Sequence, residues 1–227
     1  MKTITKIIEE QVHRWQILHQ EGAQETEGIS VVTLSGEPGS GGRLVASKLA
    51  DKLGIDLFHK EVINEMAKSA DVSERLLETL DERGLSTLED WISGLVHDRH
   101  LWPDEYSKHL MKVIGTIGKH GRAVIVGRGA NFILPTDKRY AVRIVAPQSR
   151  RIENVSREFG ISRENAKRRV MRTESDRRAF IRKYFNADIA DPTNYDLVIN
   201  SATLSVESTV NVISAALGCL VGCALLT

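Results

Sequence analysis

A cluster of glycines is the part of this sequence whose residue types and spacing could do chemistry most directly. Its members fall within eight residues and are Gly36, Gly39, Ser40, Gly41, Gly42 and Arg43. Glycines let successive backbone N–H groups converge on one anion, and a helix that follows them points the positive end of its dipole at that anion. The cluster therefore predicts a phosphate-binding loop. The alternative is a tight turn between a strand and a helix that binds no ligand.

The loop matches only part of the P-loop pattern G-x-x-x-x-G-K-[ST]. Gly36 and Gly41 occupy the two glycine positions, but Gly42 stands in place of the lysine and Arg43 in place of the hydroxyl residue. Arg43 could replace some of the lost positive charge, but its guanidinium cannot bind Mg²⁺ as a hydroxyl does. Ser40 is a candidate for that contact, and the sequence otherwise leaves the metal ligands unknown.

A second group of side chains suited to phosphate lies near the end of a long helical stretch. We predict that it is catalytic, and its members are Arg172, Asp176, Arg177, Arg178 and Arg182. Each guanidinium can hold phosphate oxygens through two parallel hydrogen bonds, and phosphoryl transfer depends on cations that neutralise the transferring group. Arg178 and Arg182 are four residues apart and share one helix face, and Asp176 is expected to orient neighbouring arginines. The alternative is a solvated basic helix.

The elements that must position these residues alternate between strands and helices. A β-branched run from Ile29 to Leu34 precedes the glycine loop, and a helical pattern follows the loop. Further strand candidates, separated by helical stretches, are residues 123–126, 140–145 and 196–199. Such alternation predicts a three-layer α/β fold of the P-loop type, in which helices cover both faces of a parallel sheet.

Three segments are expected outside this alternating pattern. Residues from about 73 to 119 show little strand character and are predicted to form a helical insertion that covers one side of the site. Residues 1–28 are predicted to form an amphipathic helix followed by a polar linker. Residues 219–227 are predicted to form a C-terminal tail. The helix places its apolar side chains on one stripe, namely Ile4, Ile7, Ile8, Val12, Trp15 and Leu18. This stripe must pack on its own domain or on a second copy of the chain, which would form a homodimer.

Composition narrows the classes of function. The 227 residues are 41% apolar and 27% charged, with no apolar run long enough to span a membrane, so a cytoplasmic globular protein without membrane association is expected. The net charge is only +1, yet residues 150–183 hold 12 Lys and Arg against 5 Asp and Glu. A basic block of this kind indicates a local anion site more than a nucleic-acid surface. Cys219 and Cys223 are too few for a disulfide framework or a zinc site.

The runs Gly39-Ser40-Gly41-Gly42-Arg43 and Leu49 to Gly54 resemble the opening of the cytidylate-kinase-like family, which belongs to the P-loop nucleoside monophosphate kinases. The resemblance extends over residues 29–218 and includes an arginine-rich lid at about residues 163–188. Val126-Gly127-Arg128-Gly129 is similar to the family's Gly-Arg-Asp segment, whose arginine contacts the acceptor nucleotide. Here Gly129 stands at the position of the aspartate.

The resemblance implies an ATP-dependent nucleotide kinase that uses Mg²⁺. It implies that residues 36–43 bind the donor, that Arg128 binds a CMP-like or dCMP-like nucleoside monophosphate or a similar small phosphate acceptor, and that the lid arginines bind the transferring group. Lys60 could meet an acceptor phosphate, although an exposed lysine is the simpler reading. A nucleotide-binding regulatory module with little turnover is the second hypothesis. A nucleic-acid binder ranks last because aromatic residues make up only 5% of the chain.

Overall fold

The computed structural model of the chain describes residues 3–20, 28–220 and 225. Within these residues one sheet is formed by β1 (Val31–Gly36), β2 (Asp56–Phe58), β3 (Ala123–Val126), β4 (Arg139–Val145) and β5 (Leu197–Asn200). The strand order is β2-β3-β1-β4-β5, and every paired strand is parallel to its neighbour. The predicted parallel sheet is therefore confirmed. Only β2 was missed, because three residues are too few to show a hydrophobic period.

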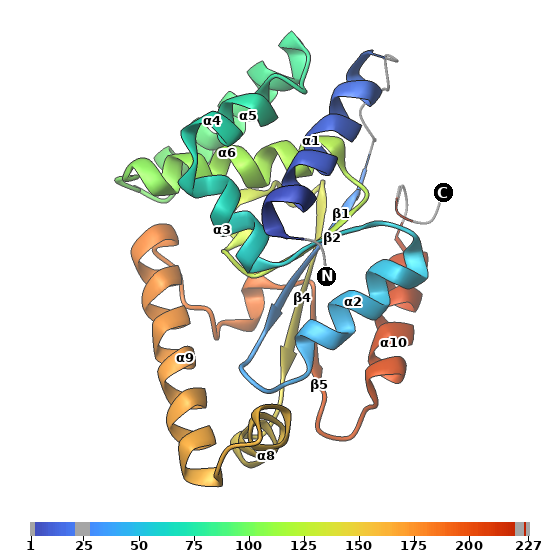
Figure 1. The fold of residues 1–227 in the computed structure, drawn as a ribbon, viewed down its shortest axis with the longest axis vertical. Coiled ribbons are helices and arrows are strands. Elements are labelled where there is room, and N and C mark those ends of the chain that lie inside the picture. The colour runs from blue at the N-terminus through green and yellow to red at the C-terminus, as the bar shows by residue number, and fades with distance from the viewer. Residues whose placement is uncertain (1–2, 21–27, 221–224, 226–227) are drawn as a thin grey trace.

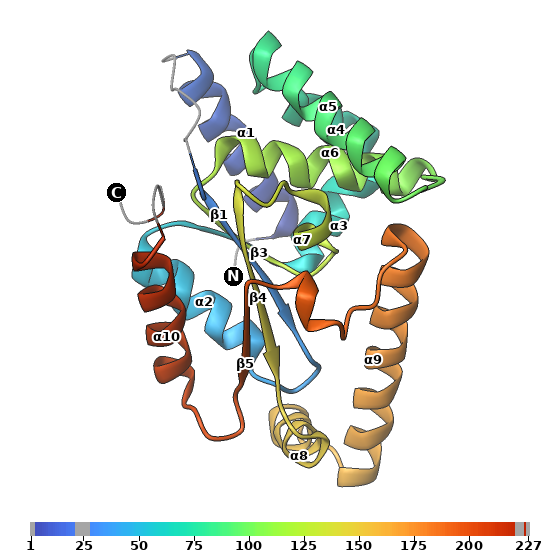
Figure 2. The same cartoon turned by 180° about the vertical axis from the view of Figure 1, so that it is seen from behind.

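Helices cover both faces of this sheet (Figures 1 and 2). On one face lie α2 (Gly42–Leu53) and α10 (Val206–Gly218). On the other lie α1 (Ile4–Gln20), α3 (Lys60–Lys68), α4 (Ala70–Leu77), α5 (Glu82–Asp98), α6 (Glu105–His120) and α7 (Ala130–Ile133). The helices α8 (Gln148–Phe159) and α9 (Arg163–Phe185) follow β4, and a short 3₁₀ helix, η1 (Pro192–Asn194), precedes β5. The predicted three-layer α/β architecture is confirmed.

The strands are apolar on both sides because each face of the sheet is buried. Val31 belongs to the core under α1, α3 and α6, whereas the next residue, Val32, belongs to the core under α2 and α10. Ala123 and Val124 divide between the two cores in the same way. Alternate strand positions point to opposite faces, so a sheet covered twice needs an unbroken apolar run. This rigid sheet holds the glycine loop at the carboxyl edge of its central strand.

The segment predicted as a helical insertion, about residues 73–119, lies within α4, α5 and α6. Each of these helices begins at a side chain that accepts a hydrogen bond from the backbone N–H three residues ahead. Ser69 caps α4, Asp81 caps α5 and Asp104 caps α6. Together these helices pack against α3 in the upper part of Figure 1, whereas the turn between β1 and α2 lies in its lower part.

The N-terminal helix packs on its own chain. Ile8, Val12 and Trp15 are buried in the core shared with α3 and α6, and the Trp15 ring stacks on His120 with their centroids 4.3 Å apart. These three members of the predicted stripe are thus covered by the chain itself, although Ile4 and Ile7 are exposed, and the structure does not support the predicted homodimer through this helix. No helix within the described residues is long and apolar enough to cross a membrane. The predicted linker after α1, Cys223 and most of the predicted tail lie outside the described residues.

The segment predicted as a lid, about residues 163–188, contains the long helix α9, which we call the lid helix and which is anchored at both ends. Ala166 and Val170 near its start pack against α8, and Ile181 and Phe185 near its end enter the core under α6. Between them, residues 171–180 include no buried side chain. The anchors hold this polar middle part of α9 across from the glycine loop (Figure 1).

Candidate functional site

The glycine loop links the end of β1 to the start of α2 in a conformation that needs glycine. Gly39 and Gly41 have φ angles of 80° and 81°, in the left-handed region that other residues avoid. A Cβ atom on Gly39 would lie 2.3 Å from the carbonyl oxygen of Arg151, and one on Gly42 would lie 3.2 Å from the Cα atom of Gly36. The loop therefore turns tightly and packs directly against the start of α8.

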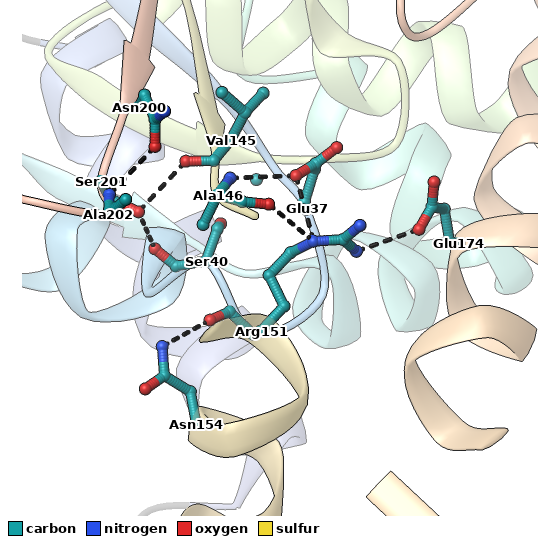
Figure 3. Close-up of polar contacts among 12 residues, drawn as sticks. Glu37, Ser40, Val145, Ala146, Arg151, Asn154, Glu174, Asn200, Ser201 and Ala202 are labelled. Carbon is teal, nitrogen blue, oxygen red and sulfur yellow. Dashed lines mark hydrogen bonds and ion pairs between the residues drawn. The ribbon is translucent and has the colours of Figure 1, made fainter. Parts of the chain in front are cut away.

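Side chains outside the loop hold its carbonyl groups. Three carbonyl oxygens accept such bonds: Gly36 from Arg177 Nη1, Gly39 from Asn154 Nδ2 at 2.8 Å, and Ser40 from Ser201 Oγ at 2.8 Å. Figure 3 shows Ser201 and Asn154 around the loop. With its acceptors held in this way, the loop is fixed in one orientation.

The amide groups of the loop are, in contrast, free to bind a ligand. In the described part of the chain, the N–H groups of Gly39, Gly41, Gly42 and Arg43 donate no hydrogen bond. Gly41 is the N-cap of α2 and offers no side chain to the first turn, so the positive end of the helix is left uncapped. Unpaired amides at a helix N-terminus form a site for an anion such as phosphate.

Three arginines from separate elements converge beside this loop. Arg177 of α9 donates to the Gly36 carbonyl, and Arg143 of β4 is buried and donates to Ser35 Oγ at 2.7 Å. Burial lowers the pKa of Arg177, and the neighbouring charges of Arg143 and Arg128 lower it further, while Glu61 opposes them. In the described residues none of the three guanidiniums forms an ion pair with a carboxylate. This arginine cluster therefore carries an excess of positive charge that a polyanion would neutralise.

Arg143 is the member of the arginine cluster that the sequence analysis missed. Its guanidinium carbon lies 5.6 Å from the centre of the Tyr195 ring, so the side chain contacts both Ser35 of β1 and Tyr195, which precedes β5. A signal was present in the sequence, because a single arginine interrupts an otherwise apolar strand from Tyr140 to Val145. A buried charge in a strand usually has a specific partner.

Arg128 and Gly129, which match the family's acceptor segment, lie beneath the end of α9. The Arg128 guanidinium carbon is 4.9 Å from the centre of the Phe180 ring, and the buried Nε has no partner. Gly129 has a φ angle of 70°, and a Cβ atom there would lie 2.1 Å from the Phe185 ring. An aspartate therefore does not fit at residue 129, because Phe185 fills the space.

Arg43 and Lys60 lie at the outer edge of the loop. Both side chains are exposed, and both approach the carboxylate of Glu61, Arg43 at 3.5 Å and Lys60 at 3.8 Å. Lys60 starts α3, where burial and the Arg43 charge lower the pKa of the adjacent His59. The structure thus places these two cations together at the surface around Glu61, whose charge also acts on Arg177 of the arginine cluster.

The remaining predicted lid residues divide into two groups. Arg178 and Arg182 line a cavity of about 390 Å³ together with Ser175, Ala179, Ala187 and Asp188. Arg172 and Asp176 are exposed and form no ion pair in the described part of the chain. The role predicted for Asp176, to orient neighbouring arginines, stays a prediction, and in the described residues it is Glu174 that accepts from Arg178 at 3.0 Å and from Arg151 at 2.9 Å.

A magnesium site made only of protein ligands is not present in the described residues, which contain no cluster of three His, Cys, Asp or Glu side chains. Mg²⁺ at kinase sites usually keeps several waters and substrate phosphates and needs only one or two protein oxygens. Ser40 Oγ is a buried hydroxyl in the loop with no hydrogen-bond partner. The residues present therefore fit a phosphate-bound Mg²⁺ with Ser40 as a ligand.

Comparison with known proteins found relatives along most of the chain. This chain is 28% identical over 185 residues to the cytidylate kinase of Ignicoccus hospitalis, and the alignment covers 82% of this chain and 97% of that enzyme. It is 26% identical over 181 residues to the cytidylate kinase of Aeropyrum pernix, with 79% and 94% coverage. Among solved structures, an uncharacterized protein from Eubacterium ventriosum has a TM-score of 0.67 and 22% identity over 84% of this chain and 98% of that one, so the two share a fold.

The sequence profile of the cytidylate kinase-like family matches residues 31–203. This match includes all five strands of the sheet, the glycine loop, the arginine cluster and the whole of α9. With the loop, the cluster and the lid helix all inside the matched region, the chain belongs to the cytidylate kinase-like family.

Proposed function

We propose that this protein transfers a phosphoryl group from ATP to a nucleoside monophosphate such as CMP or dCMP, or to a similar small phosphate acceptor. One observation carries the proposal: four loop amides without acceptors face a cluster of arginines without carboxylate partners. Both features leave positive charge unsatisfied in the protein alone, and a nucleoside triphosphate would satisfy both. The cytidylate kinases among the relatives support the choice of a nucleotide acceptor.

The donor phosphates would lie on the loop amides at the start of α2. Arg177 and Arg143 reach the loop from the side and would supply the positive charge that a P-loop lysine otherwise provides. Arginine can replace the lysine because its planar guanidinium holds two phosphate oxygens at once and stays charged at any physiological pH. Mg²⁺ would neutralise charge between the donor phosphates, with Ser40 Oγ as its protein ligand.

The acceptor would lie between Arg128 and the lid helix. Arg128 would hold the acceptor phosphate near the donor, because its charge acts on that of Arg177 at the loop. Arg178 and Arg182, which line a cavity beside α9, would neutralise the transferring phosphoryl group in the transition state. Lys60 would contribute only at the surface, since it is exposed and faces Glu61.

The identity of the acceptor base is the open part of this proposal. In the Gly-Arg-Asp segment of the family, an aspartate follows the arginine that Arg128 matches. In this chain Gly129 occupies the position of the aspartate, and Phe185 fills the space beside it. No carboxylate is therefore available beside Arg128 to hold the base, because the buried Phe185 ring fills the space where it would lie. We therefore expect weaker preference for cytosine than an aspartate would give.

Direct titration tests the function. Isothermal titration with ATP, followed by product detection with CMP, dCMP, UMP, AMP and GMP, should reveal ATP binding and transfer to at least one acceptor. Addition of excess EDTA should stop the transfer. A regulatory module, which the missing P-loop lysine at Gly42 motivates, would bind ATP but yield no diphosphate product with any acceptor at any Mg²⁺ concentration.

A further inference from the structure

A buried arginine outside the predicted site joins the glycine loop to the lid helix. Arg151 of α8 lies between two carboxylates, Glu37 in the loop and Glu174 in α9 (Figure 3). Its Nε is 3.2 Å from Glu37 Oε2, and its Nη1 is 2.9 Å from Glu174 Oε2. The same Nε also donates to the Ala146 carbonyl at 3.0 Å.

Glu37 in turn connects this arginine to the end of β4. Its Oε2 accepts a hydrogen bond from the backbone N–H of Ala146 at 3.0 Å, while its own N–H donates to the Ile144 carbonyl at 2.9 Å. Arg151 and Ala146 therefore hold the Glu37 carboxylate from two sides. The second residue of the loop is thus fixed by its side chain as well as by its backbone.

The loop and the lid helix meet at two adjacent points. Arg177 of α9 donates to the carbonyl of Gly36, and Glu174, three residues earlier on the same helix, reaches Glu37 through Arg151. Residues three apart on a helix lie on the same face, so one face of α9 is matched to two consecutive loop residues. A change in the angle of α9 cannot keep both contacts unless the loop moves with it.

Burial distinguishes this contact from the many exposed ion pairs on α8 and α9. The side chain of Arg151 is only 7% exposed and those of Glu37 and Glu174 are 17% and 23% exposed, whereas Glu153, which pairs with Arg150, is 50% exposed. Exposed pairs contribute little, but removal of one partner of a buried pair leaves an uncompensated charge. The Arg151 contact is therefore strong enough to influence the loop and the helix together.

We propose that Arg151 is a positioning residue that couples the glycine loop to the lid helix, so that phosphates bound in the loop and the orientation of the lid arginines depend on each other. Glu174 also holds Arg178 at 3.0 Å, which places a lid arginine in the same chain of contacts. Because such coupling is reciprocal in free energy, phosphate bound in the loop stabilises one orientation of the lid helix as much as that orientation strengthens phosphate binding. The catalytic part of this inference rests on the proposed function, whereas the coupling itself does not.

Hydrogen exchange in the ligand-free protein tests the coupling without any assumption about turnover. Glu174→Ala removes the lid side of the contact and keeps a good helix former. The amides of Ser40 and Ala146, which are bonded to the carbonyl and the carboxylate of Glu37, should then exchange about 5-fold faster or more, the lower range of allosteric coupling. Glu153→Ala, which removes an exposed partner of Arg150, should leave both amides unchanged. Unchanged exchange at Ser40 and Ala146 in Glu174→Ala would overturn the proposal.

Kinetics test the catalytic consequence. Because Glu174 orients the lid and also acts on the loop through Arg151, Glu174→Ala should lower kcat about 10-fold and raise KM for ATP about 5-fold, the lower range of coupling. In the Arg151→Met background, Glu174→Ala should have little further effect on kcat, since the shared contact is already lost. Fully additive losses would contradict coupling through Arg151. If loop exchange responds but the wild type phosphorylates nothing, the coupling stands and the proposed kinase function fails.

Discussion

The guanidinium of Arg177 reaches the Gly36 carbonyl from a position 141 residues later in the chain, so positive charge comes to the glycine loop from outside it. A P-loop lysine belongs to the loop and needs no tertiary contact to be close to phosphate. Here the charge depends on the packing of α9, and Arg143 depends on the register of β4. At the scale of single residues, phosphate binding is therefore divided between amides that are local and cations that are distant.

Gly41→Val should weaken ATP binding by at least about 10-fold, because a β-branched residue held at a positive φ angle costs about 1–3 kcal/mol and displaces the free amides. Isothermal titration measures the affinity, and circular dichroism checks that the variant folds. Gly54→Val is the matched control, since Gly54 also has a positive φ angle and open space around it but lies at the other end of α2. Equal ATP affinity in the folded Gly41→Val and Gly54→Val proteins would contradict phosphate binding by the loop.

Arg128→Ala should raise KM for the acceptor about 10- to 100-fold, the range for loss of a hydrogen bond to a charged group, with little change in KM for ATP. Steady-state kinetics with each substrate varied in turn separates the two effects. Arg169→Ala is the control, because the Arg169 guanidinium also lies over a ring, that of Phe159, but is not in the arginine cluster. The opposite pattern, a raised KM for ATP alone, would mean that Arg128 serves the donor.

At the scale of elements, α9 is anchored at its ends and polar in its middle. Val170 packs on α8 and Phe185 packs in the core under α6, so both ends of α9 are fixed by apolar contacts. The part between the anchors is fixed mainly by the polar contacts of Glu174 and Arg177. Lids must open to release product, and a helix whose middle has no buried apolar side chain can move at lower cost than one packed along its length.

Arg178→Ala should lower kcat on the order of 100-fold while changing ATP affinity little, since an interaction made mainly in the transition state is expressed in kcat. Single-turnover kinetics and ATP titration measure the two quantities separately. The control is Arg168→Ala, which removes an exposed arginine of the same helix that pairs only with nearby side chains of α9. Turnover that is unaffected by Arg178→Ala would refute the lid role and leave the kinase proposal intact.

At the scale of the whole molecule, two apolar cores on opposite faces of one sheet hold the site elements together. The core under α6 includes the N-terminal helix through Trp15 and also the end of the lid helix through Phe185. The core under α2 and α10 supports the other side of the glycine loop through Leu34 and Val45. The site thus lies where the two cores meet at the carboxyl edge of the sheet, as is general for parallel α/β proteins.

Trp15→Ala should lower the free energy of unfolding by about 3–5 kcal/mol, the cost of removing a buried large aromatic side chain. Urea denaturation measures this change, and ATP titration of the folded variant should give the wild-type affinity. Trp102 is 97% exposed, so Trp102→Ala should change the unfolding free energy by less than about 0.5 kcal/mol. Similar unfolding curves for both variants would show that α1 does not contribute to the core as described.

The sequence by itself determined the glycine loop, the strands around it and the parallel α/β fold. These features depend on local rules: glycine at positive φ angles, apolar runs in buried strands and helical spacing between them. Helical spacing and residue type also identified the arginine-rich helix that is α9, to which Arg177 and Arg178 belong. Residues whose role follows from their own conformation could therefore be predicted.

Only the tertiary structure decided which charges meet. Arg143, Arg151 and Glu37 gain their partners from segments more than 100 residues away or from another helix, and no local pattern encodes such contacts. Glu174 and Asp176 show the physical reason most clearly. They differ by about 200° around a helix of 3.6 residues per turn, so only one can face Arg151. Because the middle of α9 has no buried apolar residue to fix its inner face, the packing of its ends selected Glu174.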